Sequence, residues 1–221
     1  DLAFVVSSGR NKFNSNEIFS ELNSSTIALI EMQSKNRLPS IQLGILKENN
    51  SNNGLAGSGA LNGSQNQITN FFGLSNSINL FGGKLFGSIY WGMASNTSSS
   101  EGMIKSISSL QSSSFGLGYT AKSVLRENDR ILFTIDQPIR IESGELGLDV
   151  PIYRTRQKEV LFSSFNVNLS PSGREINSRL EYSSLFRNVN LSFALGYKAD
   201  PYHIKNMDDY GYISLGANIK F

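Results

Sequence analysis

The sequence predicts an all-β domain of antiparallel strands, and two observations support this fold class. Apolar and polar residues alternate with a period of two in many separate segments, which is typical of strands whose two faces meet different surroundings. Between these segments lie clusters of Ser, Asn and Gly, which favour turns over helices. The chain has 221 residues, a size at which a single β domain is common. We therefore expect one domain over residues 1–221.

The alternation is clearest at the C-terminal end of the chain. There Ile213, Leu215, Ala217, Ile219 and Phe221 alternate with Ser214, Gly216, Asn218 and Lys220. With the other alternating segments this gives about twelve strands, an even number that permits closure into an antiparallel up-and-down β-barrel. The segments are residues 2–6, 26–32, 41–48, 68–80, 85–93, 115–122, 131–136, 145–152, 161–169, 176–182, 189–198 and 213–221.

Helical character is confined to residues 14–22. Asn14 is a suitable N-cap, Glu17 follows three residues later, and the apolar residues Ile18, Phe19 and Leu22 share one face. A short helix and a polar loop with three anchoring apolar residues both fit this segment.

Pro138 interrupts one of the alternating segments. Proline has no N–H group to donate to a neighbouring strand, so it stands at strand starts, edges or bulges. We expect a bulge or a strand break near residues 136–140.

Two environments fit strands that have one apolar and one polar face. In a soluble β-sandwich the apolar side chains form the core, whereas in a transmembrane β-barrel they contact lipid and the polar ones line the interior. Alternation alone does not choose between them.

The composition argues against some other classes of protein. A net charge of +2 with 17% charged residues does not indicate nucleic-acid binding. No run of about 18 apolar residues predicts a membrane-spanning helix, and the absence of Cys excludes disulfides.

Loop lengths offer a second pattern, because bacterial barrels alternate short periplasmic turns with longer extracellular loops. Counted back from the C-terminus, residues 199–209, 96–111 and 49–66 are long outer connections, and residues 186–188 and 82–83 are short inner ones. The outer connections at residues 143–144 and 170–173 are short and do not fit.

The last eight residues favour the membrane environment. They contain a polar residue, Ser214, a glycine two residues later, Gly216, and two hydrophobic residues, Ile219 and the aromatic Phe221. This pattern resembles the β-signal of outer-membrane proteins. That resemblance implies recognition by the barrel-assembly machinery at the exposed edge of the last strand. An ordinary amphipathic strand that ends a soluble domain is the alternative.

Longer segments resemble a particular family, the C-terminal autotransporter-like β-domain of subtilisin-like serine peptidases of Gram-negative bacteria. The resemblance is strongest over residues 128–144 (NDRILFTIDQPIRIESG), although Asn128 stands where the family pattern has glycine. Further similar segments are residues 43–48 (LGILKE), 57–60 (GSGA), 84–92 (KLFGSIYWG) and 169–175 (LSPSGRE). The resemblance implies an N-terminal passenger peptidase that this domain carries to, or holds at, the cell surface.

The sequence predicts no catalytic, cofactor-binding or metal-binding residues, so we expect a chain that is not an enzyme. His203 is the only histidine and has no nucleophile elbow beside it. The spacing of ligands matches no closed zinc site or calcium-binding loop at Asp200, His203, Asp208 and Asp209. The glycine-rich residues 54–63 lack the Lys-Ser/Thr pair that ends a phosphate-binding loop. The basic residues at 154–158 are interpreted as a solvated turn.

Charged residues on the polar faces are candidates for a network inside a barrel, where opposite charges offset each other's desolvation. They are Arg174, Glu175, Arg179, Glu181, Lys198 and Lys220. The expected function is that of a non-catalytic outer-membrane translocator and anchor at the bacterial cell surface, with outer-membrane lipid, the barrel-assembly machinery and a passenger peptidase as partners. The alternatives are a soluble cell-surface structural or fibre-forming module that self-associates, and a porin-like channel.

Overall fold

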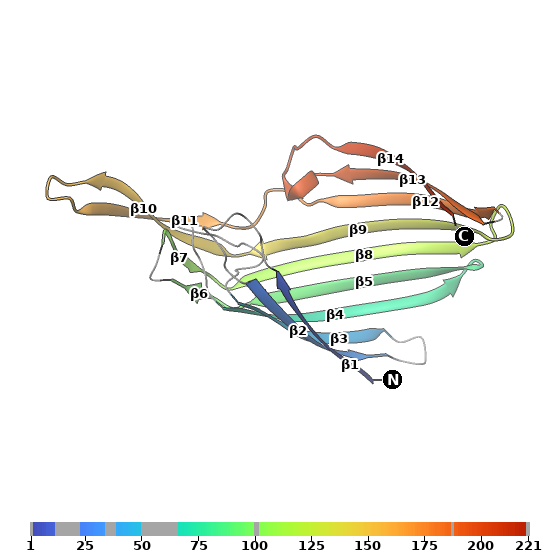
Figure 1. Ribbon diagram of the computed structural model, residues 1–221, viewed down its shortest axis with the longest axis horizontal. Helices are drawn as coiled ribbons and strands as arrows, with labels where there is room; N and C mark the ends of the chain where they lie inside the picture. Colours follow the sequence, from blue (N-terminus) through green and yellow to red (C-terminus); the bar gives the residue numbers. More distant parts are fainter. Residues whose placement is uncertain are drawn as a thin grey trace.

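The computed structural model describes residues 2–11, 23–33, 39–49, 66–99, 102–186 and 188–219. Within these ranges every regular element is a strand, apart from a 3₁₀ turn at Pro201–His203, and all strand pairs are antiparallel (Figure 1). The predicted all-β antiparallel class is confirmed. The helix predicted at residues 14–22 lies outside the described residues.

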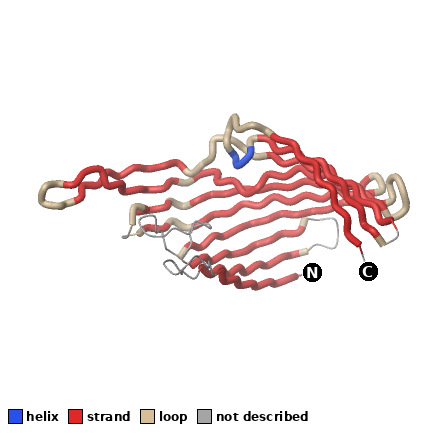
Figure 2. The backbone as a smooth tube through the Cα atoms, turned by 45° about the horizontal axis from the view of Figure 1, so that its top comes forward, coloured by secondary structure: helices blue, strands red, loops and turns tan. Residues whose placement is uncertain are grey.

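A ten-stranded sheet forms the body of the molecule, and it is strongly curved (Figure 2). Its order follows the chain, apart from two excursions, so it is an up-and-down meander with β1 and β14 as its outer strands. The strands in spatial order are β1 (Leu2–Asn11), β2 (Asn23–Met32), β3 (Ser40–Asn49), β4 (Gln67–Leu80), β5 (Gly83–Ala94), β8 (Leu110–Lys122), β9 (Asp129–Ser143), β12 (Ile176–Phe186), β13 (Val189–Ala199) and β14 (Tyr210–Ile219).

The two excursions form a second sheet of four strands at one end of the main sheet. Its strands are β11 (Val160–Asn168), β10 (Glu145–Arg154), β7 (Ile104–Ile107) and β6 (Thr97–Ser98), in this order. The β10–β11 hairpin projects beyond the main sheet (Figure 1). Gly144 separates β9 from β10 and has φ of 156°, a backbone conformation that other residues rarely adopt.

This arrangement changes the predicted strand count and corrects the loop pattern. Ten strands, and not about twelve, build the main sheet, because β10 and β11 leave it. The short connections at residues 143–144 and 170–173 are therefore the two ends of one long excursion over residues 144–175. Long connections at 95–109, 144–175 and 200–209 all lie at one end of the strands. The connections at 81–82, 123–128 and 187–188 lie at the other, which we call the short-turn end.

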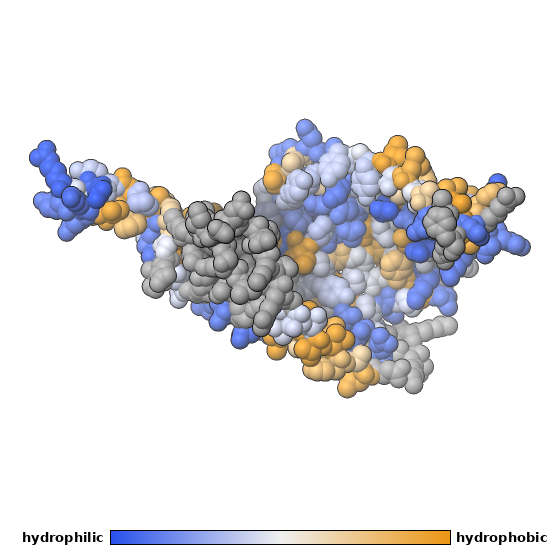
Figure 3. All heavy atoms as spheres, in the orientation of Figure 1, coloured by the Kyte–Doolittle hydropathy of each residue, from blue (hydrophilic) through white to orange (hydrophobic). Residues whose placement is uncertain are grey.

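Cross-strand pairing places most of the apolar residues of the ten strands on one face, which we call the apolar face. One row across six strands contains Leu85, Tyr119, Phe133, Leu180, Leu195 and Ile213. Four of these side chains are exposed, namely Phe133, Leu180 and Leu195 at 41–46% and Ile213 at 70%, and Leu85 and Tyr119 are partly exposed. The opposite, polar face carries Ser, Thr, Asn and charged residues, and Figure 3 shows hydrophilic residues predominating in the hollow of the molecule.

Few hydrophobic side chains are buried in the described part of the chain. They are Ala94, Ile107, Leu110, Ala121 and Ala194. Three of these, Ala94, Ile107 and Leu110, form a small cluster where the second sheet joins the main one. By contrast, Gln67, Asp129 and Gln137 are among the most deeply buried side chains. The usual distribution of a soluble domain, with apolar residues inside, is therefore inverted.

Aromatic rings on the polar face lie over glycines of the neighbouring strand. The directly paired residues are Gly44 and Phe71, Gly73 and Tyr90, Gly118 and Phe86, and Gly196 and Tyr212. In each pair a Cβ atom on the glycine would overlap the ring. The glycines thus let large rings lie flat against the backbone on the polar side of the sheet.

The bulge predicted near Pro138 is confirmed. Gln137 pairs with Phe115 and Arg140 pairs with Ser113, so three steps along β9 correspond to two steps along β8. The extra residue reverses the alternation of β9 beyond this point. Side chains at 140 and 142 consequently share a face with Gln137.

A glycine substitution on β8 tests the fit between rings and glycines. Gly118→Ala places a methyl group against the Phe86 ring, and we expect it to destabilise the fold by about 1–3 kcal/mol through forced displacement of that ring. Gly116→Ala, two residues away on the same face, is the matched control because a Cβ there meets its neighbours at 3.8 Å. Urea unfolding of the two variants gives the comparison, and equal effects would contradict the interpretation.

Candidate functional site

Polar side chains gather at the long-loop end of β9, where residues 137–142 meet residues 170–175. Glu142 is the centre of this cluster: it accepts a hydrogen bond from Ser113 Oγ at 2.6 Å and lies 3.0 Å from Arg174 Nη2. Arg140 Nη1 is its second cationic partner, and Arg174 Nη1 also donates to Gln137 Oε1. The bulge at Pro138 makes this cluster possible, because it brings Gln137, Arg140 and Glu142 to one face.

Arg140 also fixes the connection between β11 and β12. Its Nε donates to the Gly173 carbonyl and its Nη2 to the Pro171 carbonyl, both at 2.9 Å. Ser170 Oγ donates to the Glu142 carbonyl at 2.7 Å. The segment 128–144, where the resemblance is strongest, and the similar segment 169–175 are therefore in direct contact.

His203 links the loop over residues 200–209 to the same region. Its Nδ1 accepts the Glu175 N–H at 2.8 Å, and its Nε2 lies 3.1 Å from the Ile139 carbonyl. Both bonds form together only in the neutral tautomer that carries its proton on Nε2. The 3₁₀ turn has Tyr202 and His203 at φ of 59° and 60°, conformations that non-glycine residues adopt when surrounding contacts enforce them.

Gly173 is needed where this turn crosses the β11–β12 connection. A Cβ at residue 173 would lie 2.5 Å from the Lys205 backbone nitrogen and 2.8 Å from the Ile204 carbonyl carbon. The Gly173 N–H donates to the His203 carbonyl at 2.7 Å. The two backbones approach so closely that no side chain fits between them.

Glu175 is buried and ties both loops to β13. Its Oε2 accepts the Tyr202 N–H at 2.7 Å and its Oε1 lies 3.3 Å from Lys198 Nζ. Burial by itself would raise the pKa of Glu175, but the Tyr202 hydrogen bond and the Lys198 cation outweigh it and hold the pKa below its usual value. The carboxylate is thus kept ionised.

The network predicted from the sequence is present in part. Lys198 pairs with Glu175, and Arg179 pairs with Glu181 at 2.8 Å, on the polar face as expected. Arg174 instead reaches Glu142, on the face that carries apolar residues elsewhere. Lys220 lies outside the described residues.

Asp129 organises the opposite end of β9. The carboxylate is 1% exposed and accepts the N–H groups of Val124, Leu125 and Arg126 at 2.7–2.9 Å, with the Tyr182 hydroxyl at 3.2 Å. It therefore holds the turn at 123–128. Asn128 has φ of 65°, a conformation in which glycine is favoured and asparagine is among the next best residues. Asn128 therefore occupies a position where glycine would also fit the backbone.

Sequence reasoning did not identify Ser113, Asp129, Gln137, Arg140 and Glu142 as a functional group of residues. Four of them lie in the segment 128–144, so the resemblance was the one available signal. The cluster depends on the reversed alternation after Pro138. An uninterrupted period of two would assign Arg140 and Glu142 to the face opposite to Gln137.

The other predicted residues occupy separate places. Ser214, Gly216 and Ile219 lie on β14, an outer strand of the main sheet, while Phe221 is outside the described residues. Asp209 accepts hydrogen bonds from the Tyr197 hydroxyl and the Asp200 N–H. The basic residues at 154–158 form the tip of the β10–β11 hairpin, and residues 54–63 are not described.

Within the described residues, no group of three or more His, Asp or Glu side chains is arranged to hold a metal ion. Helices long and apolar enough to cross a membrane are likewise not found in this part of the chain. His203 contacts backbone groups through both ring nitrogens, so its side chain fixes the loops around it.

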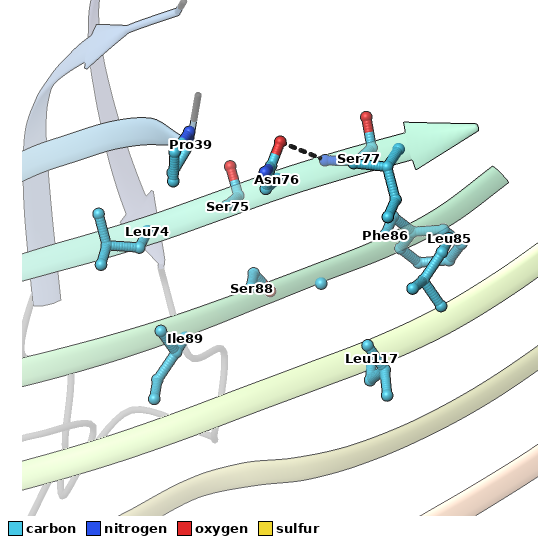
Figure 4. A pocket seen from close by; sticks show the side chains of 12 residues that line it. Pro39, Leu74, Ser75, Asn76, Ser77, Leu85, Phe86, Ser88, Ile89 and Leu117 are labelled. Carbon is cyan, nitrogen blue, oxygen red and sulfur yellow. Dashed lines mark hydrogen bonds between the residues drawn. The ribbon is translucent and has the colours of Figure 1, made fainter. Parts of the chain in front are cut away.

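The apolar face carries an open depression lined by residues of β4, β5 and β8. Leu74, Ile78, Leu85, Ile89 and Leu117 line it, together with Pro39 (Figure 4). Asn76 also borders it, and its Oδ1 accepts the Ser77 N–H at 2.8 Å, which keeps this amide oxygen bonded to the backbone. Ser75, Ser77 and Ser88 also line the depression, which is therefore predominantly apolar with a few polar groups.

Comparisons with protein-family models, with curated proteins and with solved structures find no match for this chain.

A pH experiment tests the role of Glu175. Because its pKa is lowered in the folded state, its stabilising effect is complete at neutral pH and is lost as pH falls through the folded-state pKa. We expect Glu175→Gln to cost about 1–3 kcal/mol at pH 7 and to reduce the loss of stability between pH 7 and pH 3. The measurement is urea unfolding across this range, with the exposed Glu145→Gln as the control. If wild type and Glu175→Gln lose stability equally, the assignment is wrong.

Proposed function

We propose that this chain is a non-catalytic outer-membrane β-barrel, the translocating and anchoring domain of a secreted subtilisin-like serine peptidase. The observation that carries the proposal is the continuous, uncovered apolar face of the main sheet. Each of its ten strands contributes at least one exposed hydrophobic side chain to it. One per strand, these are Phe4, Ile30, Leu43, Phe72, Trp91, Leu117, Phe133, Leu180, Leu195 and Ile213.

Such a face is unfavourable in water. Full burial of a large apolar side chain stabilises a protein by roughly 1.5–3 kcal/mol. Every strand of the main sheet has at least one exposed apolar side chain on this face that would be stabilised by removal from water. Hydrocarbon is a surrounding that would accept it without a second protein layer. Phe72 and Trp91 stack with their ring centroids 6.0 Å apart on this face, so large aromatic surface is presented outward as well.

The topology supports closure of the sheet into a barrel of ten strands. Since ten is even and every pair is antiparallel, β1 and β14 run in opposite directions and are suited to pair with each other. Closure would satisfy their open backbone groups, as a lipid surrounding requires. The ten strands have 10–15 residues each, which meets the roughly 9–11 residues that a tilted strand needs to cross a membrane.

The polar face supports the same proposal as the lining of an interior. Several of its charges have near neighbours of opposite sign, as in Arg179 with Glu181 and Lys198 with Glu175. Pairs of this kind suit a confined aqueous space, where an isolated charge would be costly.

The link to a peptidase passenger comes from the resemblance of residues 128–144 and 169–175. These two segments are bonded to each other: Arg140 donates to the carbonyls of Gly173 and Pro171, and Arg174 pairs with Glu142. Together they fix the β11–β12 connection to β9. In the proposed orientation the long-loop end is extracellular, so this cluster would stabilise the loops nearest the passenger.

A soluble, self-associating surface module is the second candidate, and the open sheet edges favour it. The nine residues of β11 form an outer strand without a charged residue, and Leu161, Phe162 and Phe165 on it are exposed. Such edges pair readily with strands of other copies.

Fractionation of a Gram-negative host expressing the chain behind a signal sequence distinguishes the two candidates. We expect the protein in the outer-membrane fraction after urea washing, with a gel mobility that changes on heating because a folded barrel resists detergent. A protein recovered in solution without detergent would contradict the barrel and support the surface module.

A pair of adjacent substitutions tests which face meets lipid. Leu43→Arg places a charge on the apolar face of β3, and we expect it to destabilise the membrane-inserted protein by about 2–4 kcal/mol. Gln42→Arg is the matched control, because Gln42 lies on the polar face and its side chain already donates to Glu31 at 3.2 Å, which would accept an Arg. Urea unfolding in lipid vesicles measures both. In a soluble module the exposed Leu43→Arg would be tolerated, and that result would count against the proposal.

A further inference from the structure

Three cations lie together on the polar face at the short-turn end of the main sheet. Lys122 on β8 and Arg130 on β9 are direct cross-strand partners. Lys84 on β5 pairs with Thr120, two residues before Lys122 on the same face of β8. Three adjacent strands therefore each contribute a positive charge to one patch, which we call the cationic patch.

Two carboxylates of this region, those of Asp129 and Glu181, are engaged elsewhere. Asp129 precedes Arg130, but its side chain belongs to the opposite face and is used by three backbone N–H groups and Tyr182. Glu181 lies on the polar face of β12 and pairs with Arg179. Across the described ranges, no ion pair within 4.0 Å joins Lys84, Lys122 or Arg130 to a carboxylate.

A cavity of about 520 Å³ opens beside the cationic patch, under the β4–β5 turn. Lys84 and Lys122 line it, with the polar side chains of Asn79 and Thr120. Arg130 joins the same wall by donating from Nε to Thr120 Oγ1 at 3.2 Å. Two lysines thus border the cavity, and the Arg130 guanidinium is bonded to the hydroxyl of a third lining residue, Thr120.

Like charges directly opposite each other destabilise a sheet. The Lys122–Arg130 pair carries this cost, which a bound anion would remove. We propose that the cationic patch is a binding site for a multiply charged oxyanion of the phosphate class. Phosphate carries up to two negative charges near neutral pH and three or more acceptor oxygens, which match three cations and the neighbouring donors. A single carboxylate would neutralise one cation and leave the other two facing each other.

This inference does not rest on the proposed membrane function, because the cationic patch exists on the folded sheet whether or not a bilayer surrounds it. It also differs in its test. A chain that never enters the outer membrane can still bind phosphate, and a membrane-inserted barrel can fail to do so.

The test is phosphate binding by the purified, folded chain, measured by titration calorimetry and by the thermal midpoint at constant ionic strength. Inorganic phosphate is the probe, with acetate and chloride as the comparison anions. We expect phosphate, and not acetate, to raise the midpoint of the wild type through preferential binding to the folded state.

Three variants locate the effect. Lys122→Gln and Arg130→Gln should each weaken phosphate binding at least about tenfold, a loss of about 1.4 kcal/mol, and raise the midpoint measured without phosphate. Lys47→Gln, an equal charge change on β3 outside the cationic patch, should leave phosphate binding unchanged. The proposal is overturned if phosphate has no more effect than acetate on the wild type, or if all three variants respond to phosphate as the wild type does. Lys84→Gln is the substitute if either variant fails to fold.

Discussion

The fold depends on the alternation of side chains across a single sheet, because that sheet has no second layer over its apolar face in the described chain. Apart from β9 beyond Pro138, the ten strands keep the same phase, so rows such as Phe133, Leu180 and Leu195 run across neighbouring strands without interruption. A one-residue register slip in any strand would move its apolar side chains to the polar face. The fold therefore requires that the pairing register of each strand is fixed by other contacts.

Several local devices fix that register. Aromatic rings sit over directly opposed glycines, as with Phe86 and Gly118, and a shifted strand would bring each ring against a side chain instead. At the short-turn end Asp129 holds its turn through three backbone N–H groups. At the long-loop end Arg140 and Glu142 bind the β11–β12 connection to β9. Polar contacts thus order a sheet that has almost no buried apolar core.

Period-two patterning predicted the strands well because it reflects how each strand faces its surroundings. It could not assign strands to sheets: residues 145–152 and 161–169 alternate like the others, yet they form β10 and β11 of the second sheet. The departure occurs at Gly144, whose positive φ has no distinct sequence signal. The polar cluster was missed for a related reason. Pro138 predicted a bulge, but the face of Arg140 and Glu142 follows only when the extra residue is placed in register.

If the proposed function is correct, one face of this sheet contacts hydrocarbon and the other contacts water. The chain has no cysteine, so single spin labels can be introduced at each residue of β13 and their collision rates with oxygen and with a water-soluble nickel complex can be measured in lipid vesicles. The account predicts that oxygen collisions peak at residues 191, 193, 195 and 197 and nickel collisions peak at the residues between them. Nickel collisions that peak at the odd-numbered positions would show that the apolar face meets water, and would contradict the account.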